Sequence, residues 1–264
     1  MYILNNKFYN EESAFKPENL LREAKRQKGL PNCEVPSICI LDPDGDILAY
    51  LLRSNKAKLN TCWACYHTKL YNFDFNGMEI GIVACAVGAS FAVLIAEQIF
   101  VSGCDILISI TSSGIISEAQ QGIEYILIEE AIRDEGTSYH YLPPEKVTSI
   151  SSPILAQLKA DLLPYNSALK VGKSWTTDAP YRETYSAIQN MREKGVDVVE
   201  MEAAALYAFA EAKDKKVICF AHITNSMAQA GVDFEKGLEN GSIASLSLIY
   251  LSVSSLVHLI EPKL

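Results

Sequence analysis

Seventeen consecutive uncharged residues, at positions 80–96, constrain the fold of this 264-residue chain more than any other stretch. The stretch is slightly shorter than the roughly 20 apolar residues of a membrane-spanning helix. Gly88-Ala89-Ser90 divides it in the middle, and residues of this kind favour a boundary between two elements. We therefore predict a buried strand over residues 78–87 and a helix over residues 90–101, rather than a membrane span.

The rest of the chain continues this alternation of strands and helices. Residues 69–75 and 78–87 flank Asn76-Gly77, a pair that is typical of a tight hairpin turn. Further strands are predicted at 37–41, 105–110, 125–130, 168–175, 195–199 and 217–223, and further helices at 17–28, 153–163, 182–194, after 202 and at 243–260. No linker or low-complexity tract interrupts the pattern. We predict a single α/β domain over residues 37–264, preceded by an N-terminal extension over residues 1–36.

The charge balance and the N-terminus narrow the possible partners and the compartment. A net charge of -9, without a basic stripe, argues against binding to nucleic acid. Residues 1–10 lack the apolar segment of a secretion signal. Seven cysteines form an odd number without regular spacing, as in proteins of a reducing cytoplasm. A cytoplasmic protein that contacts neither nucleic acid nor membrane is expected.

Two further patterns are predicted to carry no cofactor or metal. Cys62 and Cys65 are two residues apart and His67 follows them, but a tetrahedral zinc site needs a second pair of ligands that is missing nearby. These cysteines are predicted to be free thiols. The glycines form no phosphate loop of the Walker or dinucleotide type, so no nucleotide cofactor is expected.

Polar residues follow four of the predicted strands directly. They are Ser112-Ser113, Thr177-Asp178, Glu200-Met201-Glu202 and Thr224-Asn225. Open α/β sheets place ligands at the carboxyl ends of their strands. A carboxylate accepts two hydrogen bonds from a vicinal diol, and a thioether offers an apolar wall to a sugar. The pattern favours a pocket for a sugar or nucleoside. For the two glutamates there is an alternative interpretation, in which they only interact favourably with the N-terminus of the helix that follows them.

Three separated motifs resemble a known family. The run Val199-Glu200-Met201-Glu202-Ala203-Ala204 resembles the signature of the nucleoside phosphorylase superfamily, which includes purine and uridine phosphorylases and related nucleosidases. Residues 131–141, with the sequence AIRDEGTSYHY, and residues 175–184, with the sequence WTTDAPYRET, resemble the uridine phosphorylase branch. The resemblance extends from residue 37 to the C-terminus.

The resemblance implies a fold, an assembly and a reaction. The fold would be a central mixed β-sheet, curled toward a barrel and flanked by α-helices, in a homodimer or hexamer. The reaction would be cleavage of the N-glycosidic bond of a nucleoside, with Glu202 as the catalytic glutamate that holds the ribose hydroxyls. The substrate-binding residues it implies are Ser112, Ser113 and Gly114 for phosphate, ribose and base, Tyr181 and Arg182 for the base, Glu200 and Met201 beside Glu202, and Asn225.

The positions that would bind phosphate depart from the family pattern. The family's anion loop falls on residues 41–48, which contain Asp42, Asp44 and Asp46 but no arginine. Ser109 stands at the position of a second arginine, and residues 62–67, where a neighbouring subunit would supply a third, contain none. Desolvated carboxylates repel a phosphate dianion. Phosphate as a partner is therefore doubtful, and hydrolysis is predicted, with an aspartate of this loop as the general base.

Two alternatives to hydrolysis and one question of substrate stay open. The chain could carry out phosphorolysis of the uridine phosphorylase type with an altered phosphate site that uses His67 or Lys69. It could instead bind a nucleoside without catalysis. Asn225 stands where purine-cleaving members use an aspartate, and an amide cannot protonate a leaving base as a carboxylic acid does. This favours a pyrimidine or a modified base.

Overall fold

The computed structural model describes residues 2–117, 122–226 and 234–260. Within this part, the strands are β1 (Ile38–Asp42), β2 (Ala57–Leu59), β3 (Leu70–Phe75), β4 (Met78–Ala84), β5 (Ile106–Ile115), β6 (Tyr125–Asp134), β7 (Val147–Ser149), β8 (Leu169–Thr177), β9 (Val198–Glu200) and β10 (Lys216–Ser226). The α-helices are α1 (Pro17–Lys28), α2 (Asp46–Arg53), α3 (Ala89–Val101), α4 (Ser152–Leu162), α5 (Tyr185–Glu193), α6 (Ala203–Lys213) and α7 (Ser242–Leu256). The 3-10 helices are η1 (Tyr2–Leu4), η2 (Ser138–His140), η3 (Pro180–Arg182), η4 (Leu238–Gly241) and η5 (Val257–Leu259).

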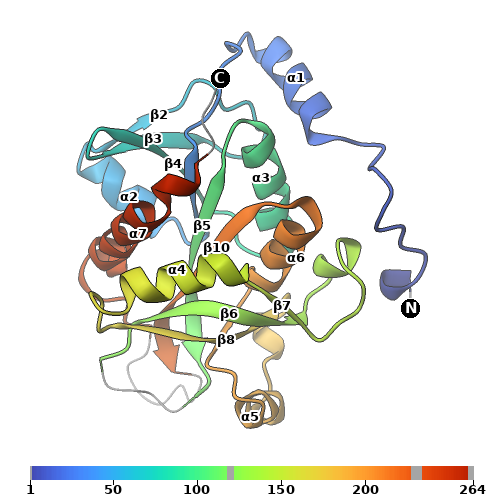
Figure 1. The fold of residues 1–264 in the computed structure, drawn as a ribbon, viewed down its shortest axis with the longest axis vertical. Helices are drawn as coiled ribbons and strands as arrows, with labels where there is room; N and C mark the ends of the chain where they lie inside the picture. The colour runs from blue at the N-terminus through green and yellow to red at the C-terminus, as the bar shows by residue number, and fades with distance from the viewer. Residues whose placement is uncertain (1, 118–121, 227–233, 261–264) are drawn as a thin grey trace.

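All ten of these strands belong to one mixed sheet. Its order is β10-β6-β8-β9-β5-β1-β4-β3-β2, with β7 paired to β6 and a further pairing between β10 and β5. That pairing closes β5, β9, β8, β6 and β10 into a five-stranded barrel, while β1 to β4 continue as an open sheet (Figure 1). The predicted fold, a single α/β domain with a mixed sheet curled toward a barrel and flanked by helices, is confirmed.

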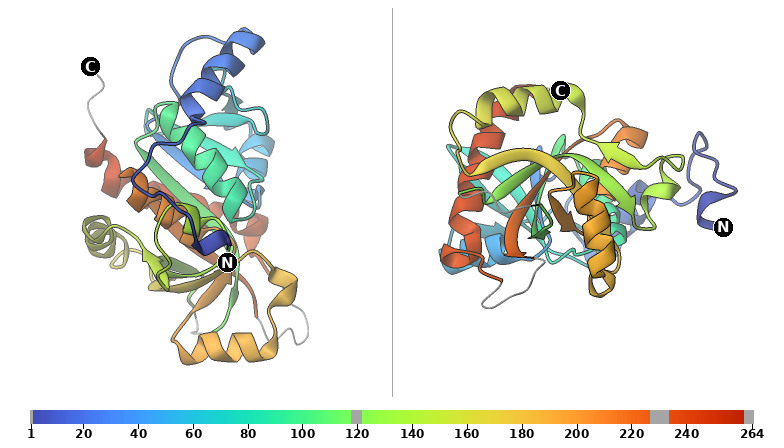
Figure 2. Two further views of the ribbon diagram at one scale, coloured as in Figure 1. Left: turned by 90° about the vertical axis from the view of Figure 1, so that its right-hand side faces the viewer. Right: turned by 90° about the horizontal axis from the view of Figure 1, so that it is seen from below.

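Helices cover the sheet on two sides. α3 packs against α6 and α1, and α7 packs against α4 and α2 (Figures 1 and 2). α6 buries every residue from Ala203 to Ala210, which is expected of a helix that is apolar all round. The segment 238–259, which contains α7, is long and apolar enough to cross a membrane by length and composition, and half of its apolar window is buried in the structure. Packing of α7 against α4 and α2 accounts for this buried half.

The uncharged stretch at 80–96 forms the end of β4 and the start of α3, as predicted. The hairpin of β3 and β4 turns at Asn76-Gly77, where both residues have positive φ. Among the strands and α-helices described, three were not predicted, namely α2, β2 and β7. β2 and β7 have three residues each, too few for a periodic pattern to show in the sequence.

The N-terminal extension runs along one side of the molecule, from α1 to η1 (Figure 2). α1 begins with a proline in its first turn and ends at Gly29, which has the left-handed conformation that favours glycine at this position. At the other end of the extension, Lys7 Nζ lies 2.8 Å from His140 Nδ1. The Tyr9 hydroxyl donates to the carbonyl of Tyr139. The extension therefore contacts the body of the protein at two places: α1 packs against α3, and residues 7–9 bind at η2.

A disulfide ties the extension to the loop before β3. It joins Cys33 to Cys62, so the prediction of a free thiol was wrong for Cys62, whereas Cys65 is free and buried. The physical reason is the docking of α1, because Lys28 Nζ donates to the carbonyls of Ala64 at 2.8 Å and Cys65 at 2.7 Å. Cys33 follows α1 in the chain and is thereby brought to a partner 29 residues away.

We expect Cys33→Ser to lower the free energy of unfolding by about 3–4 kcal/mol, the chain-entropy value for a closed loop of 29 residues. Denaturant unfolding of the two proteins under oxidising conditions measures the difference. Cys85→Ser is the matched control, because Cys85 is exposed and free, and it is expected to unfold like the wild type. Equal stability of Cys33→Ser and wild type would contradict a contribution from the disulfide.

Candidate functional site

Three strand ends meet where the barrel closes. Gly114 of β5 pairs with Val199 of β9 on one side and with Asn225 of β10 on the other. The polar residues that follow or end these strands are therefore neighbours in space, as the strand-end pattern predicted. The loop after β1 joins them, because the backbone N–H of Ser112 donates to Asp44 Oδ2 at 2.8 Å.

Glu202 lies at the centre of this group and is only 1% exposed. Its Oε1 accepts from the backbone N–H of Gly88 at 2.7 Å, and its Oε2 accepts from the Thr111 hydroxyl at 2.9 Å and from the Met201 N–H at 3.3 Å. Burial, together with the neighbouring carboxylate of Glu200, raises the pKa of Glu202 to about 8. The carboxyl group thus joins the start of α3 to β5.

Glu200, which was predicted to contact the substrate, forms hydrogen bonds at the start of α6. One of its oxygens accepts from the backbone N–H groups of Glu202 and Ala203, both at 2.7 Å. Its other oxygen accepts from the Thr176 hydroxyl, which also accepts from the N–H of Ala204. Glu200 and Thr176 together satisfy the first N–H groups of α6. Burial raises the pKa of Glu200 as well.

Asp42 was predicted as a catalytic residue, and the structure places it beneath the site. It is 2% exposed, and its two oxygens accept from the N–H groups of Gly45 and Leu48 at 3.1 and 2.9 Å. These bonds lie at the start of α2. Both oxygens are thus committed to the backbone and face away from solvent.

Burial raises the pKa of Asp42 to about 7. The hydrogen bonds from the N–H groups of Leu48 and Gly45 act to lower this pKa, but the effect of burial is larger. The folded state therefore holds this proton at pH values where the unfolded chain has released it. Its contribution to stability is complete below pH 4 and is lost as the pH rises through about 7.

We expect the free energy of unfolding of the wild type to fall by roughly a few kcal/mol more than that of Asp42→Asn between pH 4 and pH 7. Urea unfolding at a series of pH values measures both proteins. Parallel pH profiles of the two proteins would show that Asp42 does not hold a proton in the folded state.

Asp44 is the aspartate of this loop that faces the other site residues. Its side chain is 29% exposed, and its charge adds to the effects that raise the pKa of Glu202. Lys236, which was not predicted as a site residue, lies 3.9 Å from Asp44 and 2.7 Å from Asp46. Asp46 also accepts from the Asn240 side chain. No pattern in the sequence relates Lys236 to residues almost 200 positions earlier.

The other residues predicted beside the strand ends contribute to the sheet. Ser113 is buried, and its hydroxyl donates to the carbonyl of His222 on β10 at 3.0 Å. The Thr224 hydroxyl contacts the Asn225 side-chain oxygen at 3.2 Å. The Ser113 bond and the backbone pairing of the two strands hold β5 to β10, and this pairing sets Asn225 beside Gly114.

Tyr181 and Arg182, predicted to contact the base, lie on η3. Tyr181 is fully exposed and Arg182 is exposed as well. The structure therefore leaves both side chains in solvent rather than against Glu202 or Ser112.

The second and third motifs bind each other. Trp175 Nε1 donates to Asp134 at 2.9 Å, and the N–H of Gly136 donates to Asp178 at 2.8 Å. Arg133 is buried and donates to Ser138, Leu142 and Pro143. This arginine stabilises the loop after β6 and is committed to that loop rather than to the anion position near Asp44.

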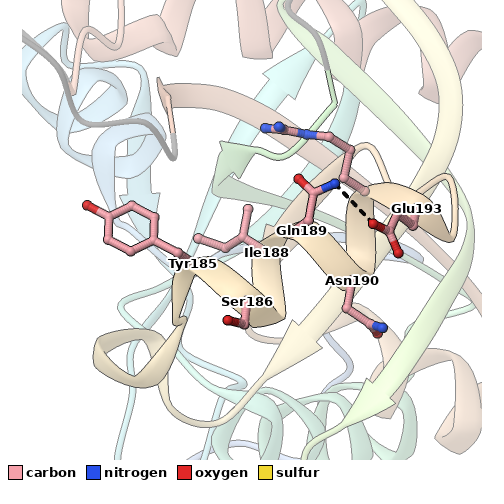
Figure 3. Close-up of a pocket in the computed structure, with 7 residues that line it drawn as sticks. Tyr185, Ser186, Ile188, Gln189, Asn190 and Glu193 are labelled. Carbon is pink, nitrogen blue, oxygen red and sulfur yellow. Dashed lines mark hydrogen bonds between the residues drawn. The ribbon is translucent and has the colours of Figure 1, made fainter.

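A surface hollow of about 680 Å³ lies along α5 and is separate from this group (Figure 3). It is lined by Tyr185, Ser186, Ile188, Gln189, Asn190, Arg192 and Glu193. All of these belong to one helix, and Gln189 bonds to Glu193 one turn later. The hollow contains none of the predicted site residues.

Comparison with known proteins gives a consistent result. The protein-family model described as the phosphorylase superfamily matches residues 37–254. The guanosine phosphorylase of Halorubrum lacusprofundi is 22% identical over 145 residues, which are 55% of this chain and only 60% of that protein. The uridine phosphorylase of Thermococcus kodakarensis is 23% identical over 222 residues, covering 71% of this chain and 78% of that protein.

The fold is also found among solved structures. A purine nucleoside phosphorylase from Toxoplasma gondii, crystallised with immucillin-H, superposes with a TM-score of 0.71 at 15% identity. The superposition covers 86% of this chain and 92% of that one. At this identity the likeness concerns the fold.

Proposed function

Because the chain belongs to the phosphorylase superfamily, we propose that it cleaves the N-glycosidic bond of a nucleoside and uses water as the nucleophile. The observation that carries this proposal is the hydrogen bond from the Ser112 N–H to Asp44. The carboxylate of Asp44 thus already accepts from the Ser112 N–H, and the resemblance assigns Ser112 to phosphate binding. Asp44 is the general base of this proposal, and Asp42 supports the loop that carries it.

Electrostatics at this position favours water over phosphate. Two like charges 4 Å apart repel by about 4 kcal/mol at an effective dielectric constant of about 20. Asp44 and Asp46 share Lys236, so the ion pairs described for this loop supply one positive charge for two carboxylates. A dianion that approached the Ser112 N–H would meet a net negative charge, whereas a neutral water molecule would not.

The reaction follows from the arrangement of the carboxyl groups. Asp44 accepts a proton from water, the water oxygen bonds to the anomeric carbon, and the electron pair of the N-glycosidic bond leaves with the base. The base takes up a proton from solvent. Glu202 holds the sugar, and Met201 beside it is half-buried. Asn225 at the same edge supports a pyrimidine or modified base as the leaving group.

A panel of nucleosides, incubated with and without phosphate and analysed for free base by chromatography, tests the proposal. Equal release in both conditions is the expected result and would identify the base. Release that requires phosphate would overturn hydrolysis and establish phosphorolysis at an altered anion site.

One observation favours a second function, the binding of a nucleoside without catalysis. Glu202 is almost completely buried, and both of its oxygens already accept hydrogen bonds from the protein. Isothermal titration calorimetry of the same nucleosides distinguishes the two functions. Binding without release of base from any nucleoside in the panel would establish the second.

A further inference from the structure

The hydrogen bonds of Glu202 limit how many sugar hydroxyls it can hold. An ionised carboxylate has about four acceptor positions, and three protein donors occupy three of them, from Gly88, Thr111 and Met201. The protonated acid offers three acceptor positions and one donor, and the same three protein donors then leave only the donor. In either protonation state one position remains for a ligand.

We infer that the site takes a nucleoside whose sugar presents one hydroxyl to Glu202, that is, a deoxynucleoside, in preference to a ribonucleoside with its vicinal diol. This inference rests on the proposed function and adds the class of sugar to it. Thr111 is the residue that sets the preference, because among the three donors it is the one whose hydrogen bond comes from a side chain.

The alternative bond of Thr111 sets the size of the preference. Its hydroxyl donates to Glu202 at 2.9 Å and lies 3.4 Å from the carbonyl of Ser112. A diol could be held by Glu202 only if Thr111 turned its proton to that carbonyl. This exchanges a good bond to a carboxyl group for a longer one to a neutral acceptor. We expect the deoxynucleoside to be preferred roughly tenfold, equivalent to about 1.4 kcal/mol.

Two substitutions at Thr111 distinguish the effect of its hydroxyl from the effect of its side-chain shape. Thr111→Val keeps the branched side chain but frees one acceptor position on Glu202, and the preference is expected to fall toward unity through better use of ribonucleosides. Thr111→Ser keeps the hydroxyl and is expected to retain the roughly tenfold preference. Thr111 is 7% exposed within β5, so thermal unfolding of both variants accompanies the kinetics.

The experiment compares kcat/KM for pairs of nucleosides that share a base, such as 2′-deoxyuridine with uridine and 2′-deoxyadenosine with adenosine. Because the two members of a pair share a base, a difference in kcat/KM between them comes from the sugar. A preference for the deoxy member in the wild type and in Thr111→Ser, abolished in Thr111→Val, is the expected result. Equal use of both sugars by the wild type, or a preference unchanged in Thr111→Val, would overturn the inference while hydrolysis stood.

Calorimetric binding of the same pairs covers the case in which no base is released. Tighter binding of the deoxy member that is lost in Thr111→Val would sustain the inference, although the proposed hydrolysis had failed. Equal affinity within each pair, or no binding of either member, would overturn the inference as well.

Discussion

Asp44→Asn is expected to lower kcat/KM for base release by about 10²- to 10⁴-fold, the range contributed by a general base. The amide cannot take a proton from water, but its oxygen can still accept from the Ser112 N–H. The fold should therefore be retained, which urea unfolding would show. The rate is measured on the nucleoside that the panel identifies.

Asp46→Asn is the matched control for this loss. Asp46 bonds to Lys236 and Asn240 rather than to Ser112, so its neutralisation changes the local charge without removing the proposed base. We expect a change in rate of less than about tenfold, as a charge contribution alone would give. Similar losses in both variants would assign the effect to local charge, and an unchanged rate in Asp44→Asn would exclude Asp44 as the base.

Glu200→Ala is expected to lower the free energy of unfolding by about 3 kcal/mol or more. The substitution leaves three donors without their acceptor inside the protein, namely the N–H groups of Glu202 and Ala203 and the Thr176 hydroxyl. Each buried donor without an acceptor costs about 1–3 kcal/mol. Relief from burying a carboxyl group offsets part of this loss. Urea unfolding at neutral pH measures the result.

Glu200→Gln is the variant that tests the cause. Its oxygen can accept from the two N–H groups of α6, so we expect a loss clearly smaller than that of Glu200→Ala. If both variants lost the same amount, the start of α6 would not depend on this acceptor.

The pattern of apolar residues predicted most of the strands and helices because they are long enough to show a period, whereas the curling of the sheet toward a barrel was implied only by the family resemblance. α2 was hidden by the turn-forming residues around Asp44, since the bonds that start it come from a side chain on the preceding strand. The disulfide was hidden for a related reason. Its formation depends on the docking of α1, which no spacing of cysteines reveals.

The site was predictable where a strand end marks it and not where distant segments complete it. Ser112 lies near the end of β5, and Glu202 and Asp44 come just after β9 and β1. All three were predicted as site residues from the sequence. Gly88 and Thr111 reach Glu202 across sequence separations of 114 and 91 residues, and no sequence pattern relates either of them to Glu202. The sequence showed that Glu200 would lie near Glu202. It could not show that the carboxylate of Glu200 accepts from the N–H groups at the start of α6.

The pairing of β10 with β5 has a consequence for synthesis of the chain. Ser113 and its partner on β10, His222, are 109 residues apart. A chain that emerges from the ribosome therefore exposes one edge of β5 until most of the protein has been made. An unpaired strand edge readily joins another chain. Truncated chains that end before β10 are expected to lack the completed site and to aggregate. The solubility of the chain therefore depends on synthesis of β10, which closes the barrel.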